Sequence, residues 1–462
     1  MLREDLCSTA TKEGCGEGDC GACVVVLGEP VAGKMVYKAV NSCIRLAHSV
    51  HGMAIWTAED IASNDQPHPV QEALVRCHGS QCGFCTPGFV MSLFAMYQNH
   101  TAKGQTISRD LAQAELSGNL CRCTGYRPIL DAAQMLHTLP RAAIDESSTL
   151  QKLELLAPES VGLEPDLLPK TGYFSPVSLK SLLHARAQHP TAQIVAGTTD
   201  VGLWVTKQHR QFDHIIDVSQ VAELRRIEDY PHHIAIGAAV TLTDAFTALC
   251  LSRPQLAHYA ARFAGLPVRN SGTLGGNVAG GSPIGDSMPL LIALGASVVL
   301  MSTRGSREFA IEDFYTGYKT NVLAPDEVLA WIKVPKATPT EFMRIYKISK
   351  RFDDDISAVC LALKVETNNA TVTKLSIGVG GVAATPVRAI KTEAACAHKT
   401  WARATIDQLK PILAGEFTPI SDMRATSAYR TQVLGNLLER FWLESQGMQQ
   451  INLESFALGS HE

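Results

Sequence analysis

Two kinds of hydrophobic spacing alternate along the chain after about residue 169. Short β-branched runs such as Ile194–Ala196 and Ile234–Ile236 predict strands, and the segments between them have helical spacing. Further strands are predicted at 342–349, 358–366 and 373–379, before a helical pattern at 427–445. The spacing therefore predicts an α+β chain, with a change of unit near residue 338.

In the first 140 residues, cysteine and glycine interrupt the apolar runs. Residues 24–27 and 35–40 predict a strand and its return strand. Residues 89–97 and 129–136 predict helices, with prolines at 87 and 128 in their first turns. The stretch 141–168 is polar with scattered prolines, and we interpret it as a linker.

Size and charge narrow the class of protein. A chain of 462 residues and 49.8 kDa is too long for one hydrophobic core, so we expect three or four domains. With 41 basic and 45 acidic residues the net charge is -4, which favours neither nucleic acid nor an anionic membrane as partner. The sequence lacks a long apolar span and a secretory signal pattern, so we expect a soluble, cytoplasmic protein.

The thirteen cysteines are unevenly distributed, with ten in the first 123 residues. Disulfide scaffolds are typically short secreted chains, so metal binding is the better interpretation. Cys250, Cys360 and Cys396 stand alone and are expected to be small core residues. Cys7 and Cys77 fall outside the motifs and are expected to be structural.

The first cysteine motif is a C-x4-C-x2-C pattern formed by Cys15, Cys20 and Cys23, with Cys43 after the predicted strand pair. This is the spacing of plant-type ferredoxins. Glycines at 14, 16, 18 and 21 would supply positive φ angles and direct backbone N–H groups at sulfur. A structural zinc site is the alternative, although zinc sites rarely need so glycine-rich a loop.

The second motif combines Cys82 and Cys85 with the pair Cys121 and Cys123. Predicted helices begin soon after each pair, and their N-terminal dipoles would favour the added electron of a reduced cluster. From this motif alone a tetrahedral zinc site remains an alternative.

Three loops of small residues suggest a ligand cradle. Residues 197–200 follow a predicted strand and precede a helix-like segment at 201–207, so their amides could hold a pyrophosphate. An ordinary glycine turn explains that loop equally well. Residues 271–277 and 280–286 add two similar loops, and packing seldom needs three. Because none reads G-x-G-x-x-G, a Rossmann fold is disfavoured.

The cysteine motifs resemble those of the xanthine dehydrogenase and aldehyde oxidase family of molybdenum hydroxylases. Residues 82–88 and 118–126 resemble its all-helical [2Fe-2S] domain, and residues 12–23 resemble its β-grasp ferredoxin-like domain. The resemblance implies two [2Fe-2S] clusters with the metal ligands Cys15, Cys20, Cys23, Cys43, Cys82, Cys85, Cys121 and Cys123. A ferredoxin-like domain normally opens with a hairpin well before its first ligand. We therefore expect this domain to be truncated at its start, with upstream coding sequence or impaired occupancy of the first cluster.

The small-residue loops resemble the PCMH/VAO-type α+β FAD domain of the same family. The resemblance implies pyrophosphate contacts at 195–201, phosphate and ribitol contacts at 273–277, an adenosine contact at Asp286, and packing of Phe263 on the isoalloxazine ring. The implied FAD-binding residues are Val195, Ala196, Gly197, Thr198, Thr199, Asp200, Val201, Phe263, Thr273, Leu274, Gly275, Gly276, Asn277, Asp286, Ile332 and Lys347. The family loop has Gly-Gly or Gly-Asn where this chain has Gly197-Thr198, which puts the contact at Thr198 in doubt.

The C-terminal segments 350–357 and 421–430 resemble the family's C-terminal α+β flavoprotein domain. An ordinary solvated turn is an alternative for the acidic triplet 353–355. The expected domains are a ferredoxin-like domain at 1–58, a helical [2Fe-2S] domain at 59–140, a linker at 141–168, an FAD domain at 169–337 and a C-terminal domain at 338–455.

The resemblance implies the electron-transfer subunit of a bacterial-type xanthine dehydrogenase. A large molybdopterin-binding partner would hydroxylate xanthine or hypoxanthine, in a heterodimer or a dimer of heterodimers, with NAD⁺ as acceptor. By family analogy the helical-domain cluster lies nearer molybdenum and the ferredoxin-like cluster nearer FAD. The alternatives are another hydroxylase acting on aldehydes, nicotinate or other N-heterocycles, a stand-alone electron-transfer module, and a structural zinc scaffold.

Overall fold

The computed structural model describes residues 1–62, 66–142, 144–156 and 172–448. The chain forms two compact units, which are described separately. Unit 1 comprises 1–223, 241–244 and 261–273, and unit 2 comprises 224–240, 245–260 and 274–462. Each unit combines parts of more than one expected domain, and the segment expected to bind FAD contributes to both.

Unit 1 begins with a three-stranded sheet in the order β2-β1-β3. Its strands are β1 (Val24–Val31), β2 (Lys34–Asn41) and β3 (Ala54–Trp56). Ala32 and Gly33 join β1 to β2 with φ angles of 50° and 73°. Two positive φ angles in a two-residue loop match the right-handed twist of the strands, so the predicted strand pair closes as a tight hairpin.

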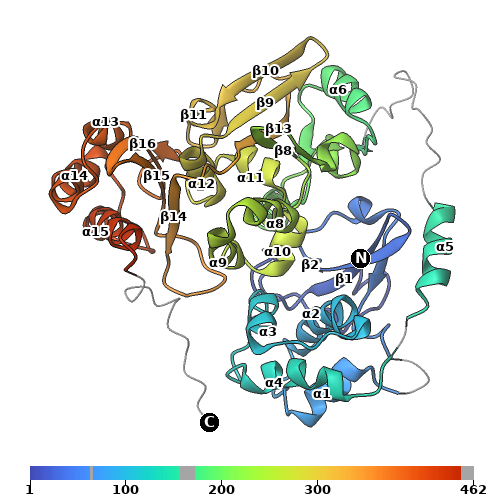
Figure 1. Cartoon of the computed structure of the whole chain (residues 1–462). Coiled ribbons are helices and arrows are strands. Elements are labelled where there is room, and N and C mark those ends of the chain that lie inside the picture. The colour runs from blue at the N-terminus through green and yellow to red at the C-terminus, as the bar shows by residue number, and fades with distance from the viewer. Residues whose placement is uncertain (63–65, 143, 157–171, 449–462) are drawn as a thin grey trace. The chain divides into compact units, whose positions relative to one another are not determined.

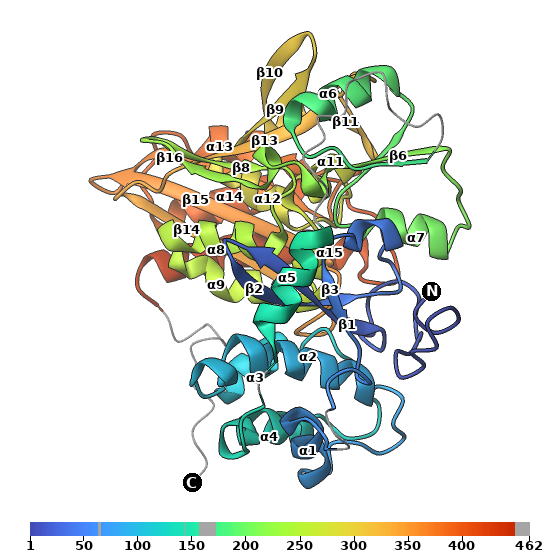
Figure 2. The same ribbon diagram turned by 90° about the vertical axis from the view of Figure 1, so that its right-hand side faces the viewer.

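Helix α2 (Thr86–Asn99) packs on β1 and β2. Three further helices pack on α2 or on one another, namely α1 (Pro69–Arg76), α3 (Arg109–Glu115) and α4 (Arg127–Met135). Figures 1 and 2 show them on one side of the β1–β2 hairpin. Residues 88–98 of α2 are all buried, as expected for a helix that is apolar on every side. One hydrophobic core includes both β1 and the four helices, so it crosses the boundary expected between residues 58 and 59.

The expected linker contains helix α5 (Glu146–Leu156), which the sequence analysis did not predict. Asp145 Oδ1 accepts a hydrogen bond from the Ser148 backbone N–H at 2.9 Å, which caps the first turn. The Tyr37 hydroxyl donates to Glu146 Oε1 at 2.8 Å and ties α5 to β2. Residues 143 and 157–168 of the expected linker lie outside the described residues.

A small parallel sheet in the order β4-β6-β5 completes the strands of unit 1. Parallel strands need crossover connections, which here contain the two helices α6 and α7. The elements are β4 (Gly172–Phe174), α6 (Leu179–Gln188), β5 (Gln193–Val195), α7 (Val201–Thr206), β6 (His214–Asp217) and α10 (Leu266–Ser271).

Unit 2 contains a five-stranded antiparallel sheet in the order β10-β9-β13-β8-β7. Its elements are β7 (Ile227–Asp229), β8 (His233–Gly237), α11 (Leu274–Gly280), α12 (Ser287–Leu294), β9 (Ser297–Ser302), β10 (Gly305–Ala310) and β13 (Val328–Pro335), with a ribbon of β11 (Tyr315–Gly317) and β12 (Thr320–Asn321). Helices α8 (Leu242–Ser252) and α9 (Ala257–Ala261) contribute residues to both units.

The C-terminal part of unit 2 is a four-stranded antiparallel sheet with helices on it (Figure 1). Its elements are β14 (Glu341–Ile348), β15 (Val359–Asn368), β16 (Thr371–Gly380), β17 (Val387–Arg388), α13 (Ile390–Cys396), α14 (Arg403–Glu416) and α15 (Ser427–Ser445). Apolar residues of β15, β16, α14 and α15 share one core. A Cβ atom on Gly378 of β16 would lie 2.0 Å from the Pro289 carbonyl oxygen, so only glycine lets α12 approach this sheet.

These strands and helices confirm the predicted multidomain α+β class. The predicted elements at 342–349, 358–366, 373–379 and 427–445 correspond to β14, β15, β16 and α15. In the described part of the chain, no helix has the length and apolar character needed to cross a membrane.

Candidate cofactor sites

The first cysteine loop directs backbone N–H groups at sulfur. The N–H groups of Glu17 and Cys20 both donate to Cys15 Sγ at 3.4 Å. Gly16, Gly18 and Gly21 have φ angles of 62°, 79° and 71°, which ordinary side chains rarely adopt. The predicted role of these glycines therefore has a visible geometric basis.

The four sulfurs of this loop interact with one another in neighbouring pairs. The pKa of Cys15 is lowered, mainly by a hydrogen bond from the Cys20 thiol and secondly by one from the Cys43 thiol. The pKa of Cys43 is raised. The largest cause is the hydrogen bond from its thiol to Cys15, and the next is its hydrogen bond to Cys23. The loop thus favours the thiolate at Cys15, and thiolate is the form that binds iron.

The second cysteine set is more exposed than the first. Cys82 and Cys123 are exposed, whereas Cys85 and Cys121 are partly buried. The N–H groups of Cys123 and Thr124 donate to Cys121 Sγ at 3.4 and 3.5 Å, and the Thr124 hydroxyl donates at 3.3 Å. Burial, followed by the hydrogen bond to Cys121, raises the pKa of Cys85 to about 12.

Both helix starts predicted beside this set are present. Helix α2 begins at Thr86, directly after Cys85, with Pro87 in its first turn. Helix α4 begins at Arg127 after Tyr126, whose hydroxyl accepts a hydrogen bond from the Cys121 N–H at 3.0 Å. The positive ends of two helix dipoles therefore lie near the second set in sequence.

The arrangement of sulfurs bears on which metal group fits. Within the described ranges, no three side chains of His, Cys, Asp or Glu are grouped so that they could hold a metal ion. A two-iron cluster takes two thiolates on each iron, and neighbouring sulfurs with N–H groups directed at them have the chemistry that such a cluster needs.

The two cysteine loops are joined by a direct backbone contact within unit 1. The Leu120 N–H, next to Cys121, donates to the carbonyl of Cys20 at 3.0 Å. Asn119 Nδ2 donates to the Gly21 carbonyl at 3.2 Å, and its Oδ1 accepts from the Ser92 hydroxyl at 2.6 Å. Asn119 lies inside the family-like motif 118–126. Its contact with Gly21, 98 positions earlier, could not be predicted from the local sequence.

The predicted pyrophosphate loop is tightly placed in unit 1. A Cβ atom on Gly197 would lie 1.7 Å from the Ser271 carbonyl oxygen, so glycine is required there. Thr198 has a φ of 59° and is buried, and its hydroxyl donates to the Ile44 carbonyl at 2.9 Å. The departure from the family pattern thus has a structural role, since the Thr198 side chain binds the backbone next to Cys43. Helix α7 spans only six residues, so loop amides would contribute more than a helix dipole.

Phe263, which was expected to pack on the flavin ring, is 7% exposed in unit 1. Buried Arg269 holds the backbone around it, donating through Nη1 to the carbonyls of Ala261, Phe263 and Ala264. The sequence analysis missed Arg269, because an arginine that binds carbonyls a few residues away looks like any surface arginine in sequence.

Of the residues expected at the ribitol and phosphates, 274–277 belong to α11 in unit 2, whereas Thr273 belongs to unit 1. A Cβ atom on Gly275 would come within 2.4 Å of Ala238, so close packing alone explains this glycine. Leu274 and Ile332 are fully buried in the core, whereas Gly276 is exposed and Asn277 Oδ1 accepts from the Ser287 hydroxyl at 2.5 Å. Gly276 and Asn277 are therefore the more accessible members of this group.

Asp286 and Lys347, both expected near FAD, bind one another in unit 2. Asp286 Oδ2 accepts from Lys347 Nζ at 2.8 Å and from the Ser357 hydroxyl at 2.7 Å. All three side chains are buried. Ser357 ends the quoted C-terminal motif 350–357, yet its pairing over 71 positions could not be predicted. In the same motif Asp354 is 7% exposed, which argues against a solvated turn for the whole acidic triplet.

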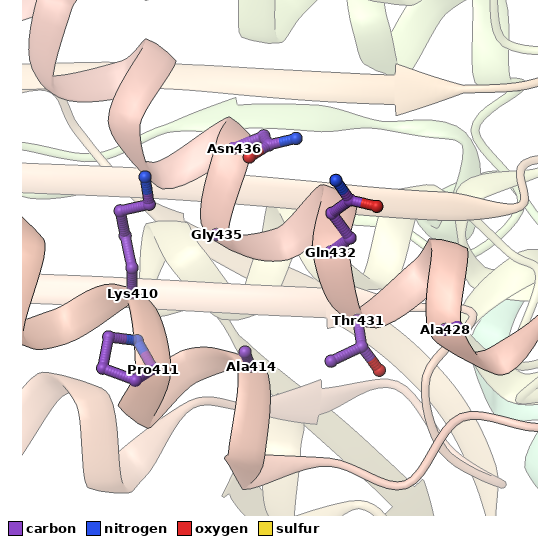
Figure 3. Close-up of a pocket in the computed structure, with 8 residues that line it drawn as sticks. All are labelled: Lys410, Pro411, Ala414, Ala428, Thr431, Gln432, Gly435 and Asn436. Carbon is purple, nitrogen blue, oxygen red and sulfur yellow. The ribbon is translucent and has the colours of Figure 1, made fainter.

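A shallow groove of about 490 Å³ lies between α14 and α15 (Figure 3). Its lining residues are Lys410, Pro411, Ala414, Ala428, Thr431, Gln432, Gly435 and Asn436. None of the residues expected to bind FAD or iron lines this groove, so it does not help to locate either cofactor.

Three family models match successive segments of the chain. The "[2Fe-2S] binding domain" model matches residues 57–134, and the "FAD binding domain in molybdopterin dehydrogenase" model matches 169–337. The "CO dehydrogenase flavoprotein C-terminal domain" model matches 344–445.

Curated relatives and solved structures agree with these matches. A xanthine dehydrogenase of Drosophila pseudoobscura pseudoobscura is 34% identical over 96% of this chain and 37% of its own length. The chain thus spans little more than a third of that relative. A carbon monoxide dehydrogenase from Hydrogenophaga pseudoflava is 27% identical, with a TM-score of 0.56 over 59% of this chain and 96% of that one. Quinoline 2-oxidoreductase from Pseudomonas putida 86, at 24% identity and a TM-score of 0.55 over 60% and 98%, shares the fold.

Proposed function

Because the chain belongs to the molybdenum hydroxylase family, of which it carries the iron–sulfur and flavin-binding parts, we propose that it is the electron-transfer subunit of a xanthine dehydrogenase. In this proposal electrons from xanthine or hypoxanthine leave a molybdopterin partner, pass through two [2Fe-2S] clusters to FAD, and reduce NAD⁺. The name of the relative that covers 96% of the chain supports the choice of xanthine.

The observation that carries the proposal is the connection among three loops of unit 1. The two cysteine loops meet through the Leu120–Cys20 hydrogen bond. Ile44, which follows the ligand Cys43, accepts a hydrogen bond from Thr198 in the predicted pyrophosphate loop 197–200, the flavin loop. Electron transfer needs redox groups held close together at fixed separations. A structural metal scaffold would not require the same backbone to touch a flavin-binding loop.

We assign the first cluster to Cys15, Cys20, Cys23 and Cys43, and the second to Cys82, Cys85, Cys121 and Cys123. Iron–sulfur clusters carry single electrons, and a bound flavin can collect two of them for a hydride acceptor. The protein's part is to hold thiolates, direct N–H groups at sulfur and fix the spacing of the loops. The flavin contacts inferred from the family, among them Gly197, Thr199, Gly276 and Asn277, remain part of the proposal.

Hydroxylation belongs to a partner chain in this proposal. The xanthine dehydrogenase relative is almost three times as long as the segment matched here, since the match covers 37% of it. We propose that the rest of the function resides in a large molybdopterin-binding subunit, assembled with this chain as a heterodimer or a dimer of heterodimers.

A second candidate is the same electron-transfer role beside a different hydroxylase. The carbon monoxide dehydrogenase chain is covered over 96% of its length at 27% identity, which favours this candidate. Because the substrate would bind to the partner, the two candidates differ in substrate and acceptor but share the clusters and the flavin.

The first experiment tests the cofactors. The purified chain should contain about four iron atoms, nearly equal acid-labile sulfide and little zinc. Cys43→Ser and Cys123→Ser should each remove one of two distinguishable paramagnetic signals of the reduced protein. A colourless zinc protein, or two unchanged signals after either substitution, would refute the cluster assignment.

The second experiment tests the division of labour. NADH should reduce the flavin-loaded chain and support transfer to an artificial dye, whereas xanthine should reduce it only after the large partner is added. Carbon monoxide, aldehydes, nicotinate and quinoline serve as competing substrates of the complex. Xanthine oxidation by the chain alone would refute the partner, and failure of NADH would remove NAD⁺ as the acceptor.

A further inference from the structure

Residues at the end of α7, which follows the flavin loop, bind the backbone of the first cysteine loop. Thr206 donates through its hydroxyl to the Gly16 carbonyl at 2.7 Å. Lys207 donates through Nζ to the carbonyl of Cys15. Both residues belong to unit 1, as does the cysteine loop, and they are separated from it by about 190 positions in sequence.

The fit between these segments is specific. The carbonyl oxygen of Ile44, next to Cys43, would lie 2.4 Å from a Cβ atom on Gly202 and accepts the Thr198 hydroxyl bond. Side chains before, within and after α7 therefore bind backbone carbonyls at or next to two members of the first cysteine set, Cys15 and Cys43. A surface contact made by chance would not require a missing Cβ atom at its centre.

Lys207 is the basic residue of this contact. Its ammonium group binds the carbonyl of a proposed iron ligand, and a Cβ atom on Gly16 would lie 3.8 Å from Nζ. Glu17 Oε2 lies 3.8 Å from the same nitrogen, so part of the charge is compensated. The Lys207 side chain is 45% exposed, and water therefore weakens its field without removing it.

We propose that Lys207 is a positioning residue that raises the reduction potential of the cluster held by the first cysteine set. This inference rests on the proposed function. A [2Fe-2S] cluster with four thiolates has a net negative charge that increases on reduction. A fixed cation beside the loop stabilises the reduced state more than the oxidised state, and charge and hydrogen bonding are recognised determinants of such potentials. A higher potential at this position favours arrival of the electron beside the flavin loop.

The test is a redox titration of the full chain with its clusters. The reduction of the first cluster is monitored by the paramagnetic signal that Cys43→Ser removes. Lys207→Met should lower the equilibrium constant for reduction by about threefold to tenfold, and tenfold corresponds to about 59 mV for one electron. Lys207→Gln keeps a donor without the charge and should give the same decrease. Lys207→Arg should restore the wild-type potential.

Lys38→Met is the matched control. Lys38 lies on β2 of the same unit and pairs with Glu29 and Asp244 at 3.6 and 3.9 Å. Its removal changes net charge equally and should leave the potential unchanged. The effect of Lys207→Met should also shrink as the salt concentration rises, because part of the field crosses solvent.

The outcomes separate this inference from the proposed function. A wild-type potential in both Lys207→Met and Lys207→Gln, or an equal decrease in Lys38→Met, would overturn the role of Lys207. If Lys207→Met loses the cluster, Lys207→Gln alone decides. Absence of both paramagnetic signals from the wild-type chain would instead refute the proposed function.

Discussion

Buried His68 makes the helical cysteine domain sensitive to acid. Its side chain is 5% exposed and its ring packs edge-on against Phe94 and Tyr97. Nδ1 accepts the Val70 N–H at 3.3 Å as the N-cap of α1, and Nε2 has no hydrogen-bond partner among the described residues. Burial lowers the pKa of His68 from 6.5 to about 4, because a charged imidazole would lose its hydration.

The lowered pKa fixes the sign and the size of the effect. The unfolded chain binds a proton at His68 below about pH 6.5, whereas the folded chain does so only near pH 4, so stability is lost as pH falls between these values. The full difference corresponds to roughly 3 kcal/mol, of which about 2 kcal/mol is lost between pH 7.5 and pH 5.0.

His68→Asn isolates this effect, because asparagine keeps an N-cap acceptor but does not titrate. The measurement is urea unfolding at pH 7.5 and pH 5.0. Because a chain of several domains need not unfold in one step, the free energy of unfolding is compared for the transition that the substitution shifts. Exposed His51 provides the control His51→Asn. If wild type and His68→Asn lose equal stability between the two pH values, His68 is not the buried neutral base described here.

Three further substitutions test the cofactor sites. Gly197→Val places side-chain atoms against the Ser271 carbonyl, so the flavin-to-protein ratio should fall at least tenfold, and normal flavin content would contradict the loop's role. Lys347→Met leaves Asp286 charged and buried and should cost about 3–5 kcal/mol in denaturant unfolding, most of which the added change Asp286→Leu should recover. Asn119→Leu removes two buried hydrogen bonds and should cost about 2–4 kcal/mol by the same measurement; an effect below about 1 kcal/mol would contradict the role of Asn119 in joining the two cysteine loops.

The sequence predicted elements well where local spacing determines them. Proline at 87 marked the start of α2, and the alternation at 373–379 marked β16. Helix α5 was missed because Asp145 to Ser148 was interpreted as linker composition, although Asp145 is an N-cap residue followed by leucines at 150, 153 and 156. A capping signal with helical spacing should have outweighed composition.

Contacts between distant positions explain why the candidate sites were only partly predictable. The bond between Asp286 and Lys347 spans 61 positions, and periodicity carries no information at that range. Motif resemblance named both residues but not their pairing. At Thr198 the resemblance exposed a departure, and only the structure showed that its hydroxyl binds the Ile44 carbonyl.

One physical rule relates the cysteine loops to their surroundings in unit 1. A loop around a negatively charged cluster directs its N–H groups inward, as the bonds to Cys15 Sγ show, so its carbonyls must point outward. Outward carbonyls need donors, and other segments supply them: the Leu120 N–H binds the Cys20 carbonyl, and Lys207 binds that of Cys15. The donors that satisfy these carbonyls are thus also the contacts that hold the second cysteine loop and the segment after α7 beside the first loop. Weakening one of them should therefore change the potential of a cluster or the coupling between clusters before it unfolds the loop.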